Sequence, residues 1–237
     1  MYEPVVIYQD NHLIAIKKRP SDIVQSDKTG DVPLSDYVKE YIRKKYNKPG
    51  AVFLGVIHRL DRPASGIVIF ARTTKALSRM NALFRNKETE KIYWAVSRAA
   101  PDNPAGELKH YLFRNTEKNK TFVFDEPDKK GTQEAVLKYE VVAEIGGYFL
   151  FRIHLITGRH HQIRAQLSHI GCPIVGDNKY GYPRGNRDQS IHLHATELSF
   201  VHPVRLEPIH LIAQPFDDVI WDKFKDVFSH FSLTESE

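Results

Sequence analysis

Short β-rich runs joined by turns constrain the fold of this chain most strongly. Residues 138–155 alternate apolar and polar side chains on either side of Gly146-Gly147, which is the pattern of a β-hairpin. Residues 5–16 contain two similar runs around a polar turn. Because such runs outnumber the predicted helices and mostly follow one another as hairpins, the sequence predicts an α+β fold with a large, mainly antiparallel sheet.

Amphipathic helices are predicted between these strands. One begins near Pro33, with Asp31 as the expected capping residue, and a second opens at Thr73-Thr74. In the second, Leu77 and Met80 share an apolar face. These helices should flank the sheet.

Composition sets limits on the class of protein. The 237 residues are 41% hydrophobic and 27% charged, as in a folded protein, and 34 Lys plus Arg against 29 Asp plus Glu give a net charge of +5, which mildly favours a polyanionic partner. Cys172 is the only cysteine, so neither an intrachain disulfide nor a cysteine-rich zinc site is possible.

We expect one catalytic domain over residues 1–237. Without a signal peptide pattern or a long apolar run, we also expect a cytoplasmic protein without membrane contact.

A polar turn, residues 58–66, separates the apolar run 52–57 from a second strand-like run. Asp61 lies in this turn between Arg59 and Arg62. An ionised carboxylate at such a position is suited to act on a substrate. Alternatively, Asp61 caps the turn and pairs with a neighbouring arginine. The local pattern leaves both interpretations open.

Three basic segments stand out elsewhere: residues 43–48 at a helix end, residues 114–120 at a predicted hairpin tip, and residues 184–187 in a loop. Each segment could hold a phosphate backbone or form an ordinary solvated surface. The sequence does not decide between these two roles.

Metal and serine chemistry are not favoured. Of the 12 histidines, His160 and His161 are adjacent, and we expect them to face different ways on a helix; His192 and His194 do not have the spacing of a zinc site either. Ser65 lacks the surroundings of a hydrolase nucleophile. We therefore predict no metal. The spacing of the glycines matches neither a P-loop nor a dinucleotide-binding motif.

Four segments resemble the RluA-type pseudouridine synthases, which isomerise uridine in RNA. Residues 58–66 resemble the signature H-R-L-D-R-x-x-S-G, and residues 157–164 resemble T-G-R-x-H-Q-I-R. Residues 171–181 resemble G-x-P-I-x-G-D-x-x-Y-G, and Lys91-Ile92-Tyr93 resembles the lysine-x-tyrosine strand of the family. The resemblance implies a pseudouridine synthase fold, with a large mixed, mainly antiparallel sheet, flanking helices and a central catalytic cleft.

The resemblance also implies roles for individual residues. Asp61 is the expected catalytic nucleophile, Tyr93 stacks on the target base, and Arg164 forms an ion pair with Asp61. Whether Asp61 attacks C1′ of the ribose, attacks the base or helps to remove a ribose proton is left open. The expected substrate-binding residues are Arg59, Arg62, Leu155, Arg159, His161, Gln162 and Ile163, with Leu155 or Ile163 packed near the base.

The implied partner is ribosomal or transfer RNA. No cofactor is expected, because the isomerisation involves neither redox change nor net hydrolysis. We expect a monomer with no obligate protein partner and no separate N-terminal RNA-binding module. Pro63-Ala64 departs from the Asp-Thr of many members, and residues 17–20 match the family's first motif only in part. The alternative function is a non-catalytic RNA-binding protein on the same scaffold.

Overall fold

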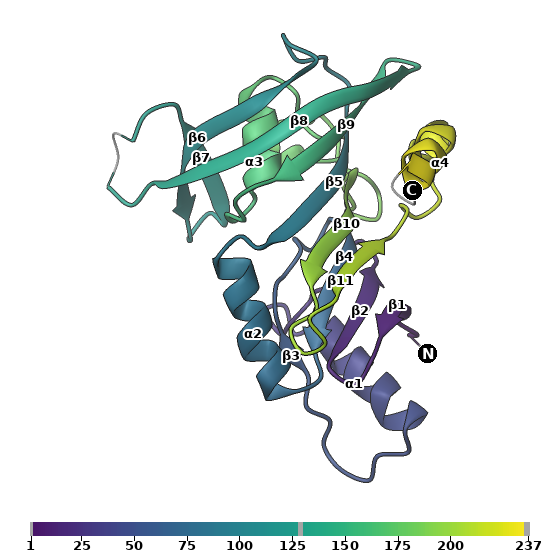
Figure 1. Cartoon of the computed structure of the whole chain (residues 1–237). Helices are drawn as coiled ribbons and strands as arrows, with labels where there is room; N and C mark the ends of the chain where they lie inside the picture. The colour runs from purple at the N-terminus through teal and green to yellow at the C-terminus, as the bar shows by residue number, and fades with distance from the viewer. Residues whose placement is uncertain (1, 128–129, 235–237) are drawn as a thin grey trace. The chain divides into compact units, whose positions relative to one another are not determined.

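A computed structural model describes residues 2–127 and 130–234 (Figure 1). The chain divides into two compact units. Unit 1 contains Met1–Thr89 and Ala195–Ala213, and unit 2 contains Glu90–His194 and Gln214–Glu237. A single catalytic domain stays a prediction. We describe each unit separately.

The sheet of unit 1 is built around two strands that are buried along nearly their whole length, β2 (Leu13–Lys18) and β4 (Ser65–Ala71). They pair antiparallel, with Ile14 opposite Phe70. The strand order is β1-β2-β4-β10, with β3 added on β4 and β11 on β10. These further strands are β1 (Val5–Gln9), β3 (Gly55–Val56), β10 (Leu193–Val201) and β11 (Pro208–Ile212). The hairpin predicted for residues 5–16 is therefore confirmed.

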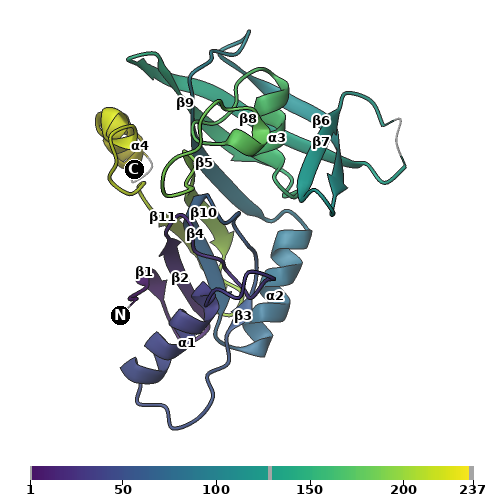
Figure 2. The same ribbon diagram turned by 180° about the vertical axis from the view of Figure 1, so that it is seen from behind.

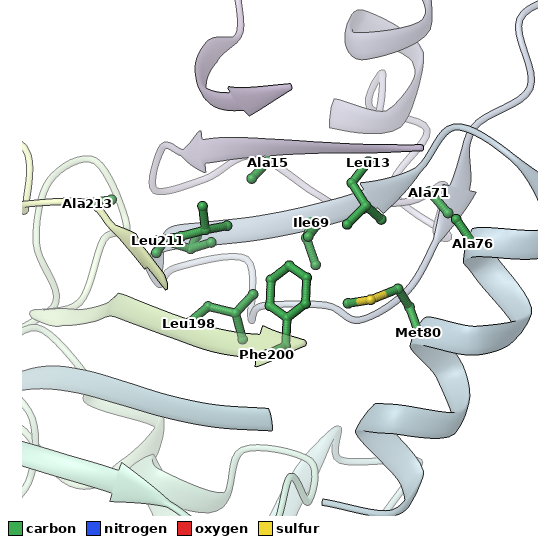
Figure 3. Packing of buried hydrophobic residues seen from close by; sticks show 11 residues of the cluster. Leu13, Ala15, Ile69, Ala71, Ala76, Met80, Leu198, Phe200, Leu211 and Ala213 are labelled. Atoms are coloured by element: carbon green, nitrogen blue, oxygen red, sulfur yellow. The ribbon is translucent and has the colours of Figure 1, made fainter. Parts of the chain in front are cut away.

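Helices α1 (Leu34–Lys45) and α2 (Thr74–Arg85) cover opposite faces of this sheet (Figures 1 and 2). Unit 1 therefore has three layers, with the sheet between the two helices. Successive side chains of β2 and β4 point to opposite faces of the sheet, so each strand contributes to both cores. One face packs Ile14, Ile16, Val68 and Phe70 against Leu34, Val38 and Ile42 of α1. The other packs Leu13, Ala15, Ile67 and Ile69 with Ala76 and Met80 of α2 and with Leu198 and Phe200 (Figure 3).

The two helix starts differ in how they are capped. Thr73 caps α2, because its side chain accepts a hydrogen bond from the Ala76 N–H. The prediction that Asp31 caps α1 was wrong: the capping position is Pro33, without a side-chain bond. Asp31 instead pairs with the guanidinium of Arg62, with 2.7 Å between Oδ2 and Nη2.

Unit 2 contains an antiparallel sheet in the order β5-β9-β8-β6-β7. The hairpin of β8 and β9 turns at Gly146 and Gly147, which have φ angles of 61° and 72° that favour glycine. Helix α3 (Gln162–His169) lies against one face of this sheet (Figure 2), and the one-turn helix η1 (Asn178–Tyr180) follows it. The strands are β5 (Thr89–Ser97), β6 (Ala105–Asn115), β7 (Lys120–Phe124), β8 (Gln133–Ile145) and β9 (Tyr148–Leu155).

An aromatic cluster covers another part of this sheet. Trp94 of β5 packs with Trp221, Phe224 and Phe228, which come from η2 (Trp221–Phe224) and α4 (Lys225–Thr234). None of the helices in the described part of the chain is long and apolar enough to cross a membrane.

Strand β10 belongs to both units: Leu193 and His194 lie in unit 2 and the rest of the strand in unit 1. The described strands form one sheet of eleven strands. The predicted α+β class with a large, mainly antiparallel sheet is confirmed.

Candidate active site

The turn that carries Asp61 lies between β3 and β4 of unit 1. The Ala64 N–H donates to the carbonyl of Asp61 at 3.1 Å and closes the turn. His58 accepts a hydrogen bond from the Ile69 N–H at its Nε2 (3.2 Å), and its ring stacks on Phe84. Ala64 is only 2% exposed, so a small side chain suits this position. Asp61 itself is partly exposed.

Lys18 supports this turn from the buried end of β2. Its side chain is fully buried, and its ammonium donates to the carbonyls of Arg19 (2.9 Å), Asp22 (2.9 Å) and Arg62 (3.1 Å). Burial lowers the pKa of Lys18 to about 7, against the opposing influence of the Asp22 and Asp61 carboxylates. The Lys18 side chain therefore lies within electrostatic range of the Asp61 carboxylate.

The arginines beside Asp61 have different surroundings. Arg59 is exposed. The backbone carbonyl of Arg62 accepts from the Ser21 N–H at 2.8 Å, while its guanidinium pairs with Asp31. Arg62 thus links the turn to the segment that precedes α1.

Gly66 ends the signature for a steric reason. Its φ angle is +120°, and a Cβ built there would lie 2.3 Å from the carbonyl oxygen of Ala195 on β10. Only glycine permits this close approach of two backbones.

In unit 2, Arg164 on α3 is buried and bound from two directions. Its Nε lies 2.6 Å and its Nη2 2.9 Å from the carboxylate oxygens of Asp177, a fork-like pair in which both residues are at most 4% exposed. Its guanidinium carbon also lies 5.0 Å from the centre of the Tyr180 ring. These two contacts orient the guanidinium.

Tyr180 connects three segments. Its hydroxyl accepts from the Thr121 N–H of β7 at 2.8 Å and lies 2.9 Å from Nδ1 of His161. The Thr121 hydroxyl donates to the carbonyl of His160 at 2.8 Å. Strand β7, the start of α3 and η1 are therefore held together by one buried network.

The expectation that His160 and His161 face different ways was wrong. Their rings stack, with centres 3.7 Å apart and planes inclined by 24°. The reason is that His161 precedes the helix in a left-handed conformation, at φ 53°. Burial and the nearby charge of Arg164 lower the pKa of His161 to about 2, so its imidazole is neutral.

The loop of residues 157–162 is tied to β8 by Gln162. The Gln162 side chain is buried; its Oε1 accepts from the Thr157 hydroxyl (2.8 Å) and from the Arg159 N–H (3.0 Å), and its Nε2 donates to the carbonyl of Val136 (3.1 Å). Arg159 is exposed and donates from Nε to the carbonyl of Glu134. Gln162 thus fixes the loop, while Arg159 lies at the surface.

The remaining predicted site residues of unit 2 belong to two of its strands and to α3. Tyr93 lies on β5 opposite Ile153 of β9 and is 9% exposed. Leu155 ends β9, and Ile163 lies in the first turn of α3; both are buried.

Lys18, Asp177 and Tyr180 were not assigned roles from the sequence. Lysine in a strand that is otherwise apolar was the available signal for Lys18. Asp177 and Tyr180 match fixed positions of the signature at residues 171–181. Their contacts with Arg164 explain why these positions carry an acidic and an aromatic residue.

Within the described residues, His110, Asp125 and His169 of unit 2 lie close enough together to be considered as metal ligands. Their possible ligand atoms are all within 4.8 Å of one another. These are not the histidines that the sequence suggested. The Gln166 amide donates to Leu108 O and lies 2.9 Å from Nδ1 of His110, which places the proton of neutral His110 on Nε2. Asp125 accepts from His169 at 2.9 Å. In this tautomer Nε2 of His110, 3.8 Å from Asp125, carries a hydrogen and offers no lone pair to a metal.

Known proteins resemble this chain along most of its length. A family model described as RNA pseudouridylate synthase matches residues 12–169. The tRNA pseudouridine synthase C of Vibrio cholerae is 31% identical and covers 98% of this chain and 97% of its own. The ribosomal large subunit pseudouridine synthase C of Buchnera aphidicola is 29% identical over 96% of this chain and 71% of its own.

Among solved structures, the human RNA pseudouridylate synthase domain containing 4 has a TM-score of 0.76 at 23% identity, covering 92% of this chain and 90% of that one. This likeness supports the fold. With the family match and the similarity to curated synthases, it leads to one conclusion: the chain belongs to the RNA pseudouridylate synthase family and is an RluA-type pseudouridine synthase, an isomerase.

Proposed function

We propose that this enzyme converts specific uridines to pseudouridine in structured RNA, either transfer or ribosomal, with Asp61 as the catalytic nucleophile. The similar proteins of Vibrio cholerae and Buchnera aphidicola are named for transfer RNA and for the large ribosomal subunit, respectively. The net charge of +5 is compatible with an RNA partner. We expect the protein to act as a cytoplasmic monomer.

The reaction is a rearrangement in which atoms balance without a cofactor. The bond from ribose C1′ to uracil N1 breaks, the base turns, and a bond from C1′ to C5 forms. The hydrogen on C5 leaves as a proton, and N1 gains a proton. A uridine inside an RNA helix has to leave the stack before these steps.

The position of Asp61 carries the proposal. Its turn begins the buried strand β4, is closed by the Ala64 N–H, and is tied through Arg62 to the buried ammonium of Lys18. Such fixed placement of a carboxylate is what nucleophilic catalysis requires.

Tyr93 and Arg164 complete the proposed chemistry. Tyr93 offers an aromatic face to the unstacked base. Arg164 forms an ion pair with Asp61; a guanidinium has five N–H donors, so this pair is compatible with the bonds to Asp177. Leu155 or Ile163 packs near the base.

The exposed Arg59 and Arg159, together with Arg62, contact RNA in this proposal. His161 and Gln162, which are buried, shape the loop that binds it.

Tritium release tests this function. RNA transcripts carrying tritium at uridine C5 should lose label to water with the wild-type protein, and the Asp61→Ala variant should release none at matched folding. Full release by Asp61→Ala would reject Asp61 as nucleophile. RNA binding without any release by the wild type would support the non-catalytic alternative.

The RNA target is found by mapping pseudouridines in total RNA from cells with and without this gene. Loss of a modified position in transfer or ribosomal RNA identifies the substrate class. Unchanged maps in both would contradict the proposed substrates.

A further inference from the structure

A group of cations gathers beside the signature of α3 in unit 2. Arg114 of β6, Lys120 of β7 and Lys179 of η1 come from three separate elements, and we call them the cationic cluster. Figure 2 shows β6 and β7 next to α3. Cations that converge from three elements create a positive potential, which favours the binding of an anion.

Strand register places Arg114 in this cluster. Arg114 pairs with Thr121 across the β6–β7 hairpin, and side chains at opposed positions of antiparallel strands lie on the same face. The Thr121 hydroxyl lies on that face and donates to the carbonyl of His160, while the Thr121 main-chain N–H donates to Tyr180. Arg114 therefore points towards the start of α3.

Tyr180 and its neighbour position the other two cations. The Lys120 ammonium lies 5.3 Å from the centre of the Tyr180 ring, the same ring that Arg164 contacts. The Lys179 ammonium donates to the carbonyl of Asn119, at the hairpin tip, at 3.1 Å. The hairpin tip is thus fastened to the segment that orients Arg164.

Arg114 and Lys120 lack carboxylate partners in the part of the chain that the structure describes. The basic end of α1 differs, because Arg43 and Lys44 both pair with Glu40 there. Of these two basic segments, the hairpin tip is the better suited to an external anion.

His161 gives independent support for a positive potential at this place. After burial, the charges that lower its pKa are those of Arg164, His160, Lys179 and Arg114. A neutral histidine among these groups leaves the positive charge to the arginines and lysines.

We propose that the cationic cluster binds a phosphodiester of the RNA strand that carries the target uridine, which makes the β6–β7 hairpin a substrate-positioning element. This proposal rests on the function proposed above. A phosphodiester fits because it is anionic along the whole strand and accepts hydrogen bonds from both arginine and lysine. The contact strengthens binding without taking part in the chemical step.

The test compares Arg114→Gln with two charge-matched controls. Lys118→Gln alters the same hairpin tip, and Lys48→Gln alters the basic segment of unit 1; both lysines are exposed. The probe is the tritiated transcript from which the wild type releases most label, assayed over a series of KCl concentrations. Melting temperatures establish that each variant is folded.

We expect Arg114→Gln to raise KM about threefold to tenfold at low salt with kcat unchanged, because one charge-assisted contact is lost. The plot of log kcat/KM against log salt should become less steep by about 0.7, the value for one phosphate contact to a single strand. Arg114→Lys should restore most of the slope, since a lysine keeps the charge. Each control should change KM by less than about twofold.

Equal effects in Arg114→Gln and Lys118→Gln would overturn the cluster as a site and indicate a general effect of charge. A loss of kcat with KM and salt slope unchanged would also overturn it. If the wild type releases no label from any transcript, the proposed function fails instead. The two failures are therefore distinguishable.

Discussion

Replacing Asp177 with asparagine tests the buried pair that orients Arg164. The pair joins two residues that are 4% and 1% exposed through contacts of 2.6 and 2.9 Å. Breaking a buried ion pair costs about 3–5 kcal/mol. Asparagine keeps one acceptor oxygen, so we expect about 3 kcal/mol, which corresponds to a fall in Tm of roughly 6–12 °C for a chain of this size.

Tryptophan fluorescence follows this change in the unit concerned. The chain has two tryptophans, Trp94 and Trp221, and both belong to the aromatic cluster of unit 2. The control is Glu134→Gln, which removes an exposed pair with Lys109 in the same unit. Such a pair contributes about 0.2–1 kcal/mol, so the Tm of this control should move by less than about 4 °C.

A double variant separates charge burial from catalysis. Arg164→Met combined with Asp177→Asn removes both charges, so it should recover part of the stability that Asp177→Asn loses. Tritium release should stay absent, because the proposed partner of Asp61 is gone. If Asp177→Asn melts like Glu134→Gln, or if the double variant is less stable than the sum of both single changes, the reasoning about this pair is refuted.

Two further predictions concern unit 1. Gly66→Ala should destabilise the protein by more than about 3 kcal/mol, because its Cβ meets the backbone of Ala195, whereas Gly50→Ala, with no atom within 4 Å of the added Cβ, should stay within about 0.5 kcal/mol. Urea unfolding measures both, and equal losses would contradict the steric argument. The folded pKa of Lys18, about 7, lies below its ordinary value of 10.5, so the unfolded state binds more protons between these values and stability should rise with pH by up to about 1.4 kcal/mol per unit. Lys18→Met should lack this rise in urea unfolding between pH 7 and 9.5, and parallel curves for both proteins would disprove the linkage.

Local pattern was sufficient for much of the fold. Alternation predicted the hairpins at residues 5–16 and 138–155, and the apolar spacing predicted α2 with its start at Thr73-Thr74. The cap of α1 was missed because Asp31 has a competing partner, Arg62, that lies 31 residues further along the chain. A local rule has no access to such a distant competitor.

The candidate site was predictable as a set of segments but not as a set of contacts. Sequence resemblance identified Arg164 as a site residue. Its bond to Asp177 depends on the path of the chain between α3 and η1, which the resemblance does not give. His160 and His161 stack because one left-handed residue interrupts the helical pattern that was assumed for them. Backbone conformations of this kind leave little trace in residue type.

The three carbonyls that bind Lys18 have a consequence for how activity is lost on heating. They connect the end of β2, the segment after it and the turn of Asp61, while β2 and β4 form the centre of unit 1. A loop held in this way cannot open on its own, because its release breaks bonds of the surrounding core. With Asp61 as the proposed nucleophile, we expect loss of activity on heating to coincide with cooperative melting of unit 1 and not to precede it.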